Sequence, residues 1–69
     1  MESLDELANE IEAIEARVTD AIFDMVRAQM RGDDPDHAKE LERLLSRVRR
    51  SLQKAQHTLR RSDDGDAEA

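Results

Sequence analysis

The sequence predicts an all-α protein, an antiparallel helical hairpin of the coiled-coil type that dimerises into a four-helix assembly. Two long segments repeat apolar residues at alternating steps of three and four, which is the period of packed helices. One short break, residues 31–35, separates these segments and contains Gly32 and the only Pro of the chain. A link of this length between two long helices makes an antiparallel hairpin. We therefore expect one helical hairpin in residues 1–61.

The first predicted helix covers residues 3–30. Ser3 is a suitable N-cap, and Glu6 three residues later completes a capping box. Acidic residues crowd the first turns, where they favour the positive end of the helix dipole. The heptad of this helix consists of Leu4, Leu7, Ile11, Ile14, Val18, Ala21, Met25 and Ala28.

The second predicted helix covers residues 35–61 and follows a turn at residues 31–35. Gly32 can take the left-handed conformation that ends a helix, Asp34 can cap the next helix, and Pro35 suits its first position. Residues 62–69 are polar and acidic, and we expect them to form a disordered tail. The heptad of the second helix consists of Leu41, Leu45, Val48, Leu52, Ala55 and Leu59.

The second half of the first helix carries a further apolar stripe. Its members lie off the heptad, so this half of the helix is apolar on two faces. A wide core inside a bundle of four helices and a docking surface for a partner protein account for the stripe equally well. The stripe consists of Ile22, Phe23, Val26 and Met30.

A homodimer is expected because a hairpin of two helices covers only part of this apolar surface. The chain has 69 residues, and so short a chain buries a small core without a partner. A second copy that completes a four-helix assembly covers the apolar surface that remains.

The composition excludes several classes of protein. The chain has no Cys, and one Phe but no Tyr or Trp, so it lacks disulfides, thiolate metal sites and an aromatic base-stacking platform. It has no glycine-rich phosphate loop, and its two His are too far apart to share a metal. We therefore expect neither an enzyme nor a metalloprotein. No apolar run is long enough to span a membrane and the N-terminus is acidic, so we expect a cytoplasmic protein.

The net charge of −6 is unevenly distributed along the chain. The charged residues of positions 1–30 are mostly acidic, whereas positions 43–61 contain no Asp or Glu. Attraction between an acidic and a basic helix explains this asymmetry, and so does an anion-binding site on the second helix. The cations that raise the positive potential of the second helix are Arg43, Arg47, Arg50 and Lys54.

A polar stripe runs along the second helix beside its apolar heptad. Its members recur at steps of four, three, four and four, so they lie above one another on one face. Such a stripe suits a polar ligand held at the edge of a helix interface, although a solvated helix face can produce the same pattern by accident. The stripe consists of Glu42, Ser46, Arg49, Gln53 and His57.

The pattern Glu-x-x-x-Ser-x-x-Arg-x-x-x-Gln of residues 42–53 resembles the cyclic di-GMP signature of the RsiG family. Members of this family are actinobacterial anti-sigma factors that hold a WhiG-type sigma factor. The family pattern ends in Asp, where this chain has His57. Members with one copy of the motif are short chains that dimerise, and this chain is similar to them. The resemblance implies a ligand-loaded form that keeps a WhiG-type sigma factor from RNA polymerase.

The residue types of the stripe suit a cyclic dinucleotide. Arg49 carries a fork of donors that matches phosphate oxygens or the O6 and N7 acceptors of guanine. Glu42 can accept from the N1–H and N2–H groups of guanine, and Ser46 and Gln53 supply a short and a long hydrogen-bonding group. His57 can give one hydrogen bond, or it can charge and face a phosphate.

Two other functions are open at this point. A structural coiled-coil adaptor would use the heptads and bind no small ligand. Nucleic-acid binding would use the basic helix, but the net acidity of the chain and its lack of aromatic residues count against DNA as a partner.

Overall fold

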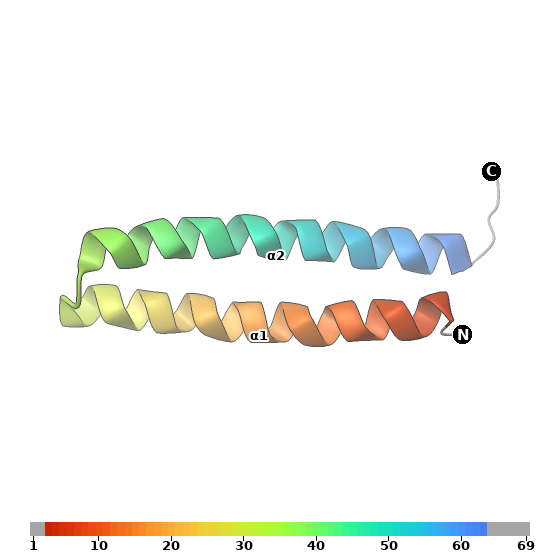
Figure 1. Ribbon diagram of the computed structural model, residues 1–69, viewed down its shortest axis with the longest axis horizontal. Helices are drawn as coiled ribbons and strands as arrows, with labels where there is room; N and C mark the ends of the chain where they lie inside the picture. Colours follow the sequence, from red (N-terminus) through yellow and green to blue (C-terminus); the bar gives the residue numbers. More distant parts are fainter. Residues whose placement is uncertain (1–2, 64–69) are drawn as a thin grey trace.

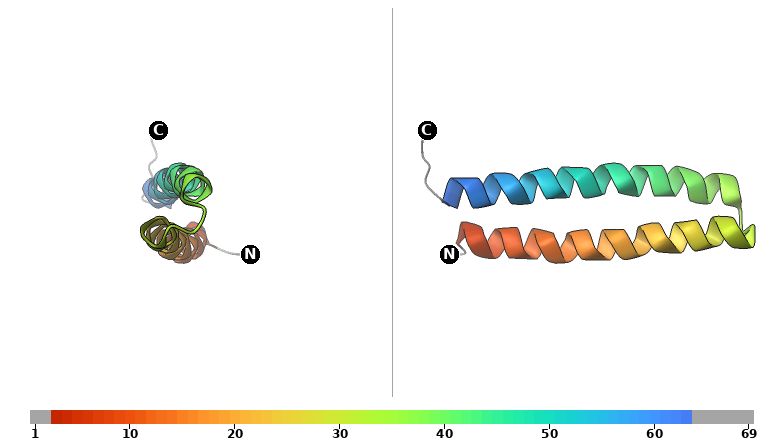
Figure 2. Two further views of the ribbon diagram at one scale, coloured as in Figure 1. Left: turned by 90° about the vertical axis from the view of Figure 1, so that its left-hand side faces the viewer. Right: turned by 180° about the vertical axis from the view of Figure 1, so that it is seen from behind.

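The computed structural model describes residues 3–63 and consists of two long helices. Helix α1 comprises Leu4–Arg31 and helix α2 comprises Pro35–Asp63. The helices lie side by side and antiparallel, with the turn at one end and the start of α1 beside the end of α2 at the other (Figure 1). The end-on view shows one helix above the other and no third layer (Figure 2). The predicted all-α hairpin is therefore confirmed.

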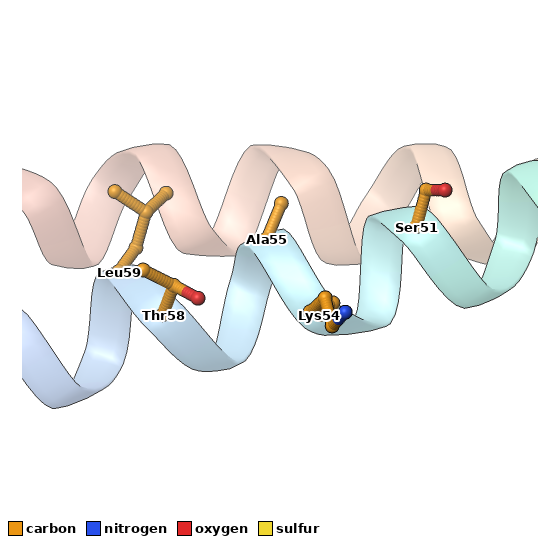
Figure 3. Close-up of a pocket in the computed structure, with 5 residues that line it drawn as sticks. All are labelled: Ser51, Lys54, Ala55, Thr58 and Leu59. Atoms are coloured by element: carbon orange, nitrogen blue, oxygen red, sulfur yellow. The ribbon is translucent and has the colours of Figure 1, made fainter.

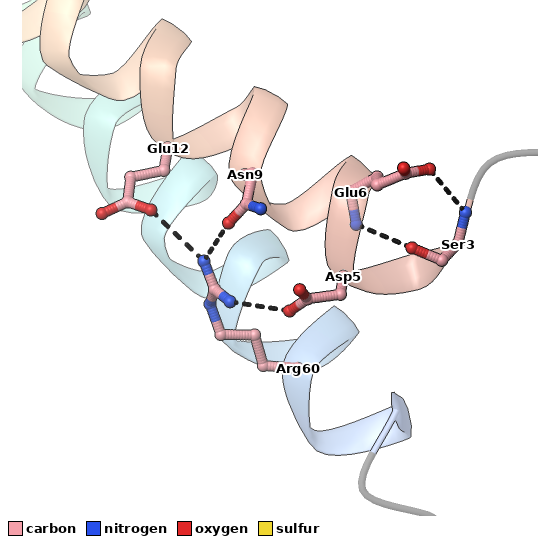
Figure 4. A network of polar contacts seen from close by, with 6 residues as sticks. All are labelled: Ser3, Asp5, Glu6, Asn9, Glu12 and Arg60. Atoms are coloured by element: carbon pink, nitrogen blue, oxygen red, sulfur yellow. Dashed lines mark hydrogen bonds and ion pairs between the residues drawn. The ribbon is translucent and has the colours of Figure 1, made fainter.

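The start of α1 is fixed by the predicted capping box. The backbone N–H of Glu6 donates to Ser3 Oγ at 3.1 Å, and the backbone N–H of Ser3 donates to Glu6 Oε1 at 3.1 Å (Figure 4). Asp5 and Glu6 stand in the first turn, where a negative charge is favourable. The cap therefore satisfies backbone donors that the helix itself leaves without partners.

The turn begins with a left-handed glycine. Gly32 has a φ of 80°, its N–H donates to Gln29 O at 3.1 Å, and the N–H of Asp33 donates to Ala28 O at 2.9 Å. This pair of bonds is the Schellman arrangement that ends many helices. Asp34 also has a positive φ, of 42°, and its carbonyl accepts the first hydrogen bond of α2 from Ala38 N at 3.0 Å. Within residues 3–63 its carboxylate makes no capping hydrogen bond. Asp34 therefore caps α2 through its backbone carbonyl alone.

The helix boundaries differ slightly from the predicted ones. Helix α1 ends at Arg31, one residue later than expected, because the Schellman bonds keep this residue in the last turn. Helix α2 continues to Asp63, two residues beyond the predicted 61, so the predicted disordered tail is wrong at residues 62 and 63. The rest of that tail, residues 64–69, lies outside the described residues.

The core of the hairpin is thin. Ala8, Ile22 and Ala38 are the buried apolar residues of the described segment, and none of its large side chains is completely buried. Two of these three, Ala8 and Ala38, are small residues that lie near opposite ends of the seam. The rest of the seam is half-buried and consists of Leu7, Ile11, Val18 and Met25 of α1 and of Leu41, Leu45, Leu52 and Leu59 of α2.

Part of each predicted heptad faces away from this seam. Ile14 is 46% exposed and Val48 is 39% exposed, and Ala55 is exposed as well. Consecutive helix residues differ by about 100° around the axis, so Ile14 and Val48 lie to one side of the seam. Glu15 and Arg49, each one residue later, are half-buried at the opposite edge of the seam. The hairpin therefore has two different flanks.

We call these the polar flank and the apolar flank. The polar flank carries the hydrogen bonds between the helices, which are made by Asp5, Asn9, Glu12, Glu15, Gln29, Glu42, Gln53, Gln56 and Arg60. Phe23, Met30, Ser46 and Arg49 lie on the same flank. The apolar flank carries a hollow near the end of α2 that is lined by Ser51, Lys54, Ala55, Thr58 and Leu59 (Figure 3). Its exposed or half-buried apolar residues are Ile14, Ala21, Leu44, Val48 and Ala55.

The hydrophobic length of the helices bears on membrane insertion. Between residues 3 and 63, neither helix combines enough length with enough hydrophobicity to cross a bilayer.

Candidate ligand-binding site on the second helix

The five residues of the predicted polar stripe follow the polar flank of α2. Glu42, Ser46 and Arg49 are half-buried, whereas Gln53 and His57 are exposed. The stripe therefore starts close to α1 near the turn and moves outward toward the end of α2. The sequence predicts a stripe beside the seam, but Glu42 and Arg49 are half-buried in it, and the structure adds residues of α1 that the prediction lacks.

Gln29 of α1 holds the first residue of the stripe. Its Nε2 donates to Glu42 Oε1 at 2.7 Å and to Met25 O at 3.2 Å, so both amide hydrogens are in use. In the described part of the chain, Gln29 Oε1 and Glu42 Oε2 have no hydrogen-bond donor. This end of the site therefore offers two acceptor oxygens to a ligand.

Glu15 of α1 holds the fourth residue of the stripe. Gln53 Nε2 donates to Glu15 Oε2 at 2.9 Å, and Gln56 Nε2 donates to Glu15 Oε1 at 3.3 Å. Glu15 is half-buried, and among residues 3–63 no cation lies within ion-pair distance of it. Because Gln53 directs its N–H group at α1, its Oε1 is the group left for a ligand.

Arg49 lies between these two ends of the stripe. It is half-buried, yet it makes no hydrogen bond or ion pair with any residue from 3 to 63. The bonds Gln29–Glu42 and Glu15–Gln53 set the register, which places Arg49 opposite the apolar part of α1 around Ile22. No carboxylate of that part of α1 reaches the guanidinium, so its donors are available to a ligand.

Arg60 provides the contrast. Its guanidinium donates to Asp5 Oδ1 at 3.1 Å, to Asn9 Oδ1 at 3.0 Å and to Glu12 Oε1 at 3.2 Å (Figure 4). These contacts join the two helices at their open end, and they occupy three of the five guanidinium donors. Arg60 therefore has a structural role that Arg49 lacks.

The four supporting cations are all exposed. Among residues 3–63, Arg43, Arg47, Arg50 and Lys54 have no ion pair. Each of the four follows a member of the stripe by one residue, about 100° further around α2, so all four border the stripe on its solvent side. Lys54 also lines the hollow of the apolar flank. All four therefore raise the positive potential around the stripe.

His57 is the outermost residue of the stripe. It is exposed and has no hydrogen bond with the rest of the described segment. It lies one helical turn beyond Gln53, on the side away from the half-buried part of the site.

The predicted partner-binding stripe divides into two parts. Phe23 is 56% exposed and Met30 is 82% exposed on the polar flank, with Val26 half-buried between them. Ile22 is only 9% exposed, because it packs in the seam between α1 and α2. Its assignment to a docking surface is therefore wrong, and the wide-core interpretation applies to this residue.

Sequence reasoning missed Glu15, Gln29 and Gln56. A signal for two of them was present: Ala8, Glu15, Ile22 and Gln29 are spaced by seven, so they share one heptad position with two buried residues. The described segment contains no group of three or more His, Cys, Asp or Glu side chains that could hold a metal ion.

The site therefore has a half-buried guanidinium without a partner among residues 3–63, and acceptor oxygens lie on either side of it along the helix. Comparison of the chain with protein families, with curated proteins and with solved structures found no match.

Proposed function

We propose that this hairpin binds cyclic di-GMP along the polar stripe of α2 and acts, as the RsiG resemblance implies, as an anti-sigma factor for a WhiG-type sigma factor. The observation that carries the proposal is Arg49, a half-buried guanidinium without a partner among the described residues. Arg49 has already lost part of its contact with water in the free hairpin, so less of it remains to be desolvated when a ligand binds. An anionic ligand supplies the hydrogen bonds that the guanidinium lacks.

The order of groups along α2 fits a cyclic dinucleotide. The acceptors at Glu42 and Gln53 are eleven residues apart, about 16 Å along the helix axis, and Arg49 lies between them. In cyclic di-GMP the phosphates form the centre and the guanine edges, with their N1–H and N2–H donors, form the two ends. A central donor fork with acceptors on either side therefore matches the ligand group by group.

The apolar flank supplies the surface for a homodimer in this proposal. Ile14, Leu44 and Val48 are each between 39% and 50% exposed and lie on one side of the hairpin. A second copy on that side completes a four-helix bundle and leaves the polar flank of each hairpin accessible. Ligand and sigma factor then bind on the outer sides of the dimer.

Phe23 and Met30 connect the ligand to the sigma factor. Both are exposed on the polar flank, where Ser46 and Arg49 also lie, so a protein that covers them also covers part of the ligand. The ligand strengthens such a complex only as far as it binds the complex better than its parts.

A structural coiled-coil adaptor is the second candidate. The thin core and the exposed apolar flank favour it, because they require a helical partner and no ligand. The unpaired Arg49 has no role in this alternative.

Calorimetric titration with cyclic di-GMP, with and without sigma factor, separates the two. We expect Arg49→Ala to weaken binding about tenfold or more, since a hydrogen bond to a charged group such as a phosphate contributes about 1.5–3 kcal/mol. Arg49→Lys should fail nearly as badly because an ammonium lacks the fork. Arg47→Ala is the matched control, since it removes the same charge from an exposed position outside the stripe. His57→Asp restores the RsiG pattern and should leave binding intact or stronger.

An absence of heat for wild type and His57→Asp under both conditions would end the cyclic di-GMP proposal. Equal losses in Arg49→Ala and Arg47→Ala would instead indicate a diffuse attraction to the basic helix.

A further inference from the structure

Two residues of α1 control the hydrogen-bonding character of the stripe. Gln29 donates both of its amide hydrogens inward, to Glu42 Oε1 at 2.7 Å and to Met25 O at 3.2 Å. Glu15 accepts from Gln53 Nε2 at 2.9 Å and from Gln56 Nε2 at 3.3 Å. In both cases the donors point into the hairpin and the acceptor oxygens are left for a ligand.

We propose that Glu15 and Gln29 are specificity-determining residues of this site, which make it select a guanine edge and reject an adenine edge. The inference rests on the proposed cyclic di-GMP function and adds α1 to a site that the motif confines to α2. Glu15 and Gln29 act by positioning Gln53 and Glu42, so they are positioning residues.

The reason is the ambiguity of a glutamine amide. Gln53 can present either its N–H₂ group or its carbonyl oxygen to a ligand, depending on the rotation of the amide. A carboxylate has acceptors only, so Glu15 binds the N–H₂ side and turns Oε1 of Gln53 outward. Gln56 holds the second oxygen of Glu15 and so fixes the carboxylate in this orientation.

The negative charge of Glu15 supports this role. The carboxylate is half-buried beside the basic helix, yet within residues 3–63 no arginine or lysine pairs with it. Two neutral amides compensate a half-buried charge less well than an ion pair does, and a charge so close to an anion site weakens the binding of any phosphate. A neutral glutamine in this position would remove that cost, but it could turn its own N–H₂ toward Gln53 and let Gln53 rotate.

The outward acceptors distinguish the two purines. The guanine edge presents N1–H and N2–H donors, which match acceptor oxygens. The adenine edge presents an N1 acceptor in the corresponding place, so it would meet the oxygens of Gln53, Gln29 and Glu42 without a proton between them. A site that presents oxygen therefore binds cyclic di-GMP better than cyclic di-AMP.

The test is the ratio of the dissociation constants for cyclic di-AMP and cyclic di-GMP, measured by calorimetry on the full chain. Glu15→Gln keeps the size of the side chain and removes its charge. Glu12→Gln is the matched control, because it makes the same change one turn away, where the partner is Arg60 and no residue of the stripe is involved. Gln29→Ala is the second variant, at the other end of the site, and circular dichroism establishes that each variant is helical.

For Glu15→Gln we expect the ratio to fall about tenfold, the usual contribution of one well-made base contact. Glu12→Gln should strengthen the binding of both dinucleotides slightly and leave the ratio unchanged. Gln29→Ala should lower the ratio as Glu15→Gln does, and it decides the matter if Glu15→Gln fails to fold.

An unchanged ratio in Glu15→Gln, with wild type binding cyclic di-GMP, overturns this inference and leaves the proposed function standing. A fall of equal size in Glu12→Gln also overturns it, since the effect would then come from the charge of α1 as a whole. If wild type binds neither dinucleotide, the proposed function and the inference both fail.

Discussion

Ile14→Ala tests the proposed dimer interface on the apolar flank. Ile14 is 46% exposed in the hairpin, and a second copy on this flank would cover the exposed part. Removal of three carbon atoms from a fully buried side chain costs about 2.4 kcal/mol at about 0.8 kcal/mol per carbon. The dimer interface accounts for the exposed share of this, about 1 kcal/mol per copy and about 2 kcal/mol for a symmetric dimer.

This loss corresponds to a dimer dissociation constant about thirtyfold higher, which sedimentation equilibrium measures directly. Alanine is the better helix former, so the local helix should not weaken. Phe23→Ala is the matched control, because Phe23 is 56% exposed but lies on the polar flank. We expect it to leave the dissociation constant within about twofold of wild type, the scatter expected for a surface substitution.

Two results would refute this reasoning. If Phe23→Ala weakens the dimer as much as Ile14→Ala does, the dimer does not use the apolar flank specifically. If wild type is a stably folded monomer at micromolar concentration, the four-helix proposal itself fails.

Three further predictions concern the hairpin. Gly32→Ala should lower the free energy of unfolding by about 1–2 kcal/mol in thermal or urea denaturation, because its φ of 80° is unfavourable for a residue with a Cβ although no neighbour lies within 4 Å of that atom. Arg60→Ala should lower it by no more than about 1 kcal/mol, since the ion pairs of Arg60 are largely exposed and screened by solvent. Leu45→Asp should abolish the helical circular dichroism signal, because it places an unpaired charge in the seam; a folded Leu45→Asp protein would contradict the assigned core.

Much of the fold followed from the sequence because its signals are local. Ser3 with Glu6 determines where α1 starts, and Gly32 determines where it ends, through hydrogen bonds to residues no more than five positions away. The heptads then require that two helices pack together.

The sequence did not show which heptad residues pack against the other helix of the hairpin and which face away from it. A heptad indicates that a residue faces some helix, and it does not say which one when a bundle has four. Val48 and Ala55 belong to the heptad of α2, but the residues that approach α1 include Glu42, Arg49 and Gln56. Glu15 and Gln29 were missed for the same reason, since polar residues at a seam position appear as solvated side chains until their partners on the other helix are known.

The thin core has a consequence for the amount of protein in a cell. A hairpin in which Ile22 is the only large residue among the buried apolar ones of the described segment has little stability of its own, so in the proposed homodimer folding and self-association would become one equilibrium. The melting temperature should then rise with total protein concentration, and dilution alone should unfold the chain. If the proposed homodimer forms, newly made copies would remain open to proteolysis until enough of them accumulate to associate, which would set a threshold of expression for the chain to persist.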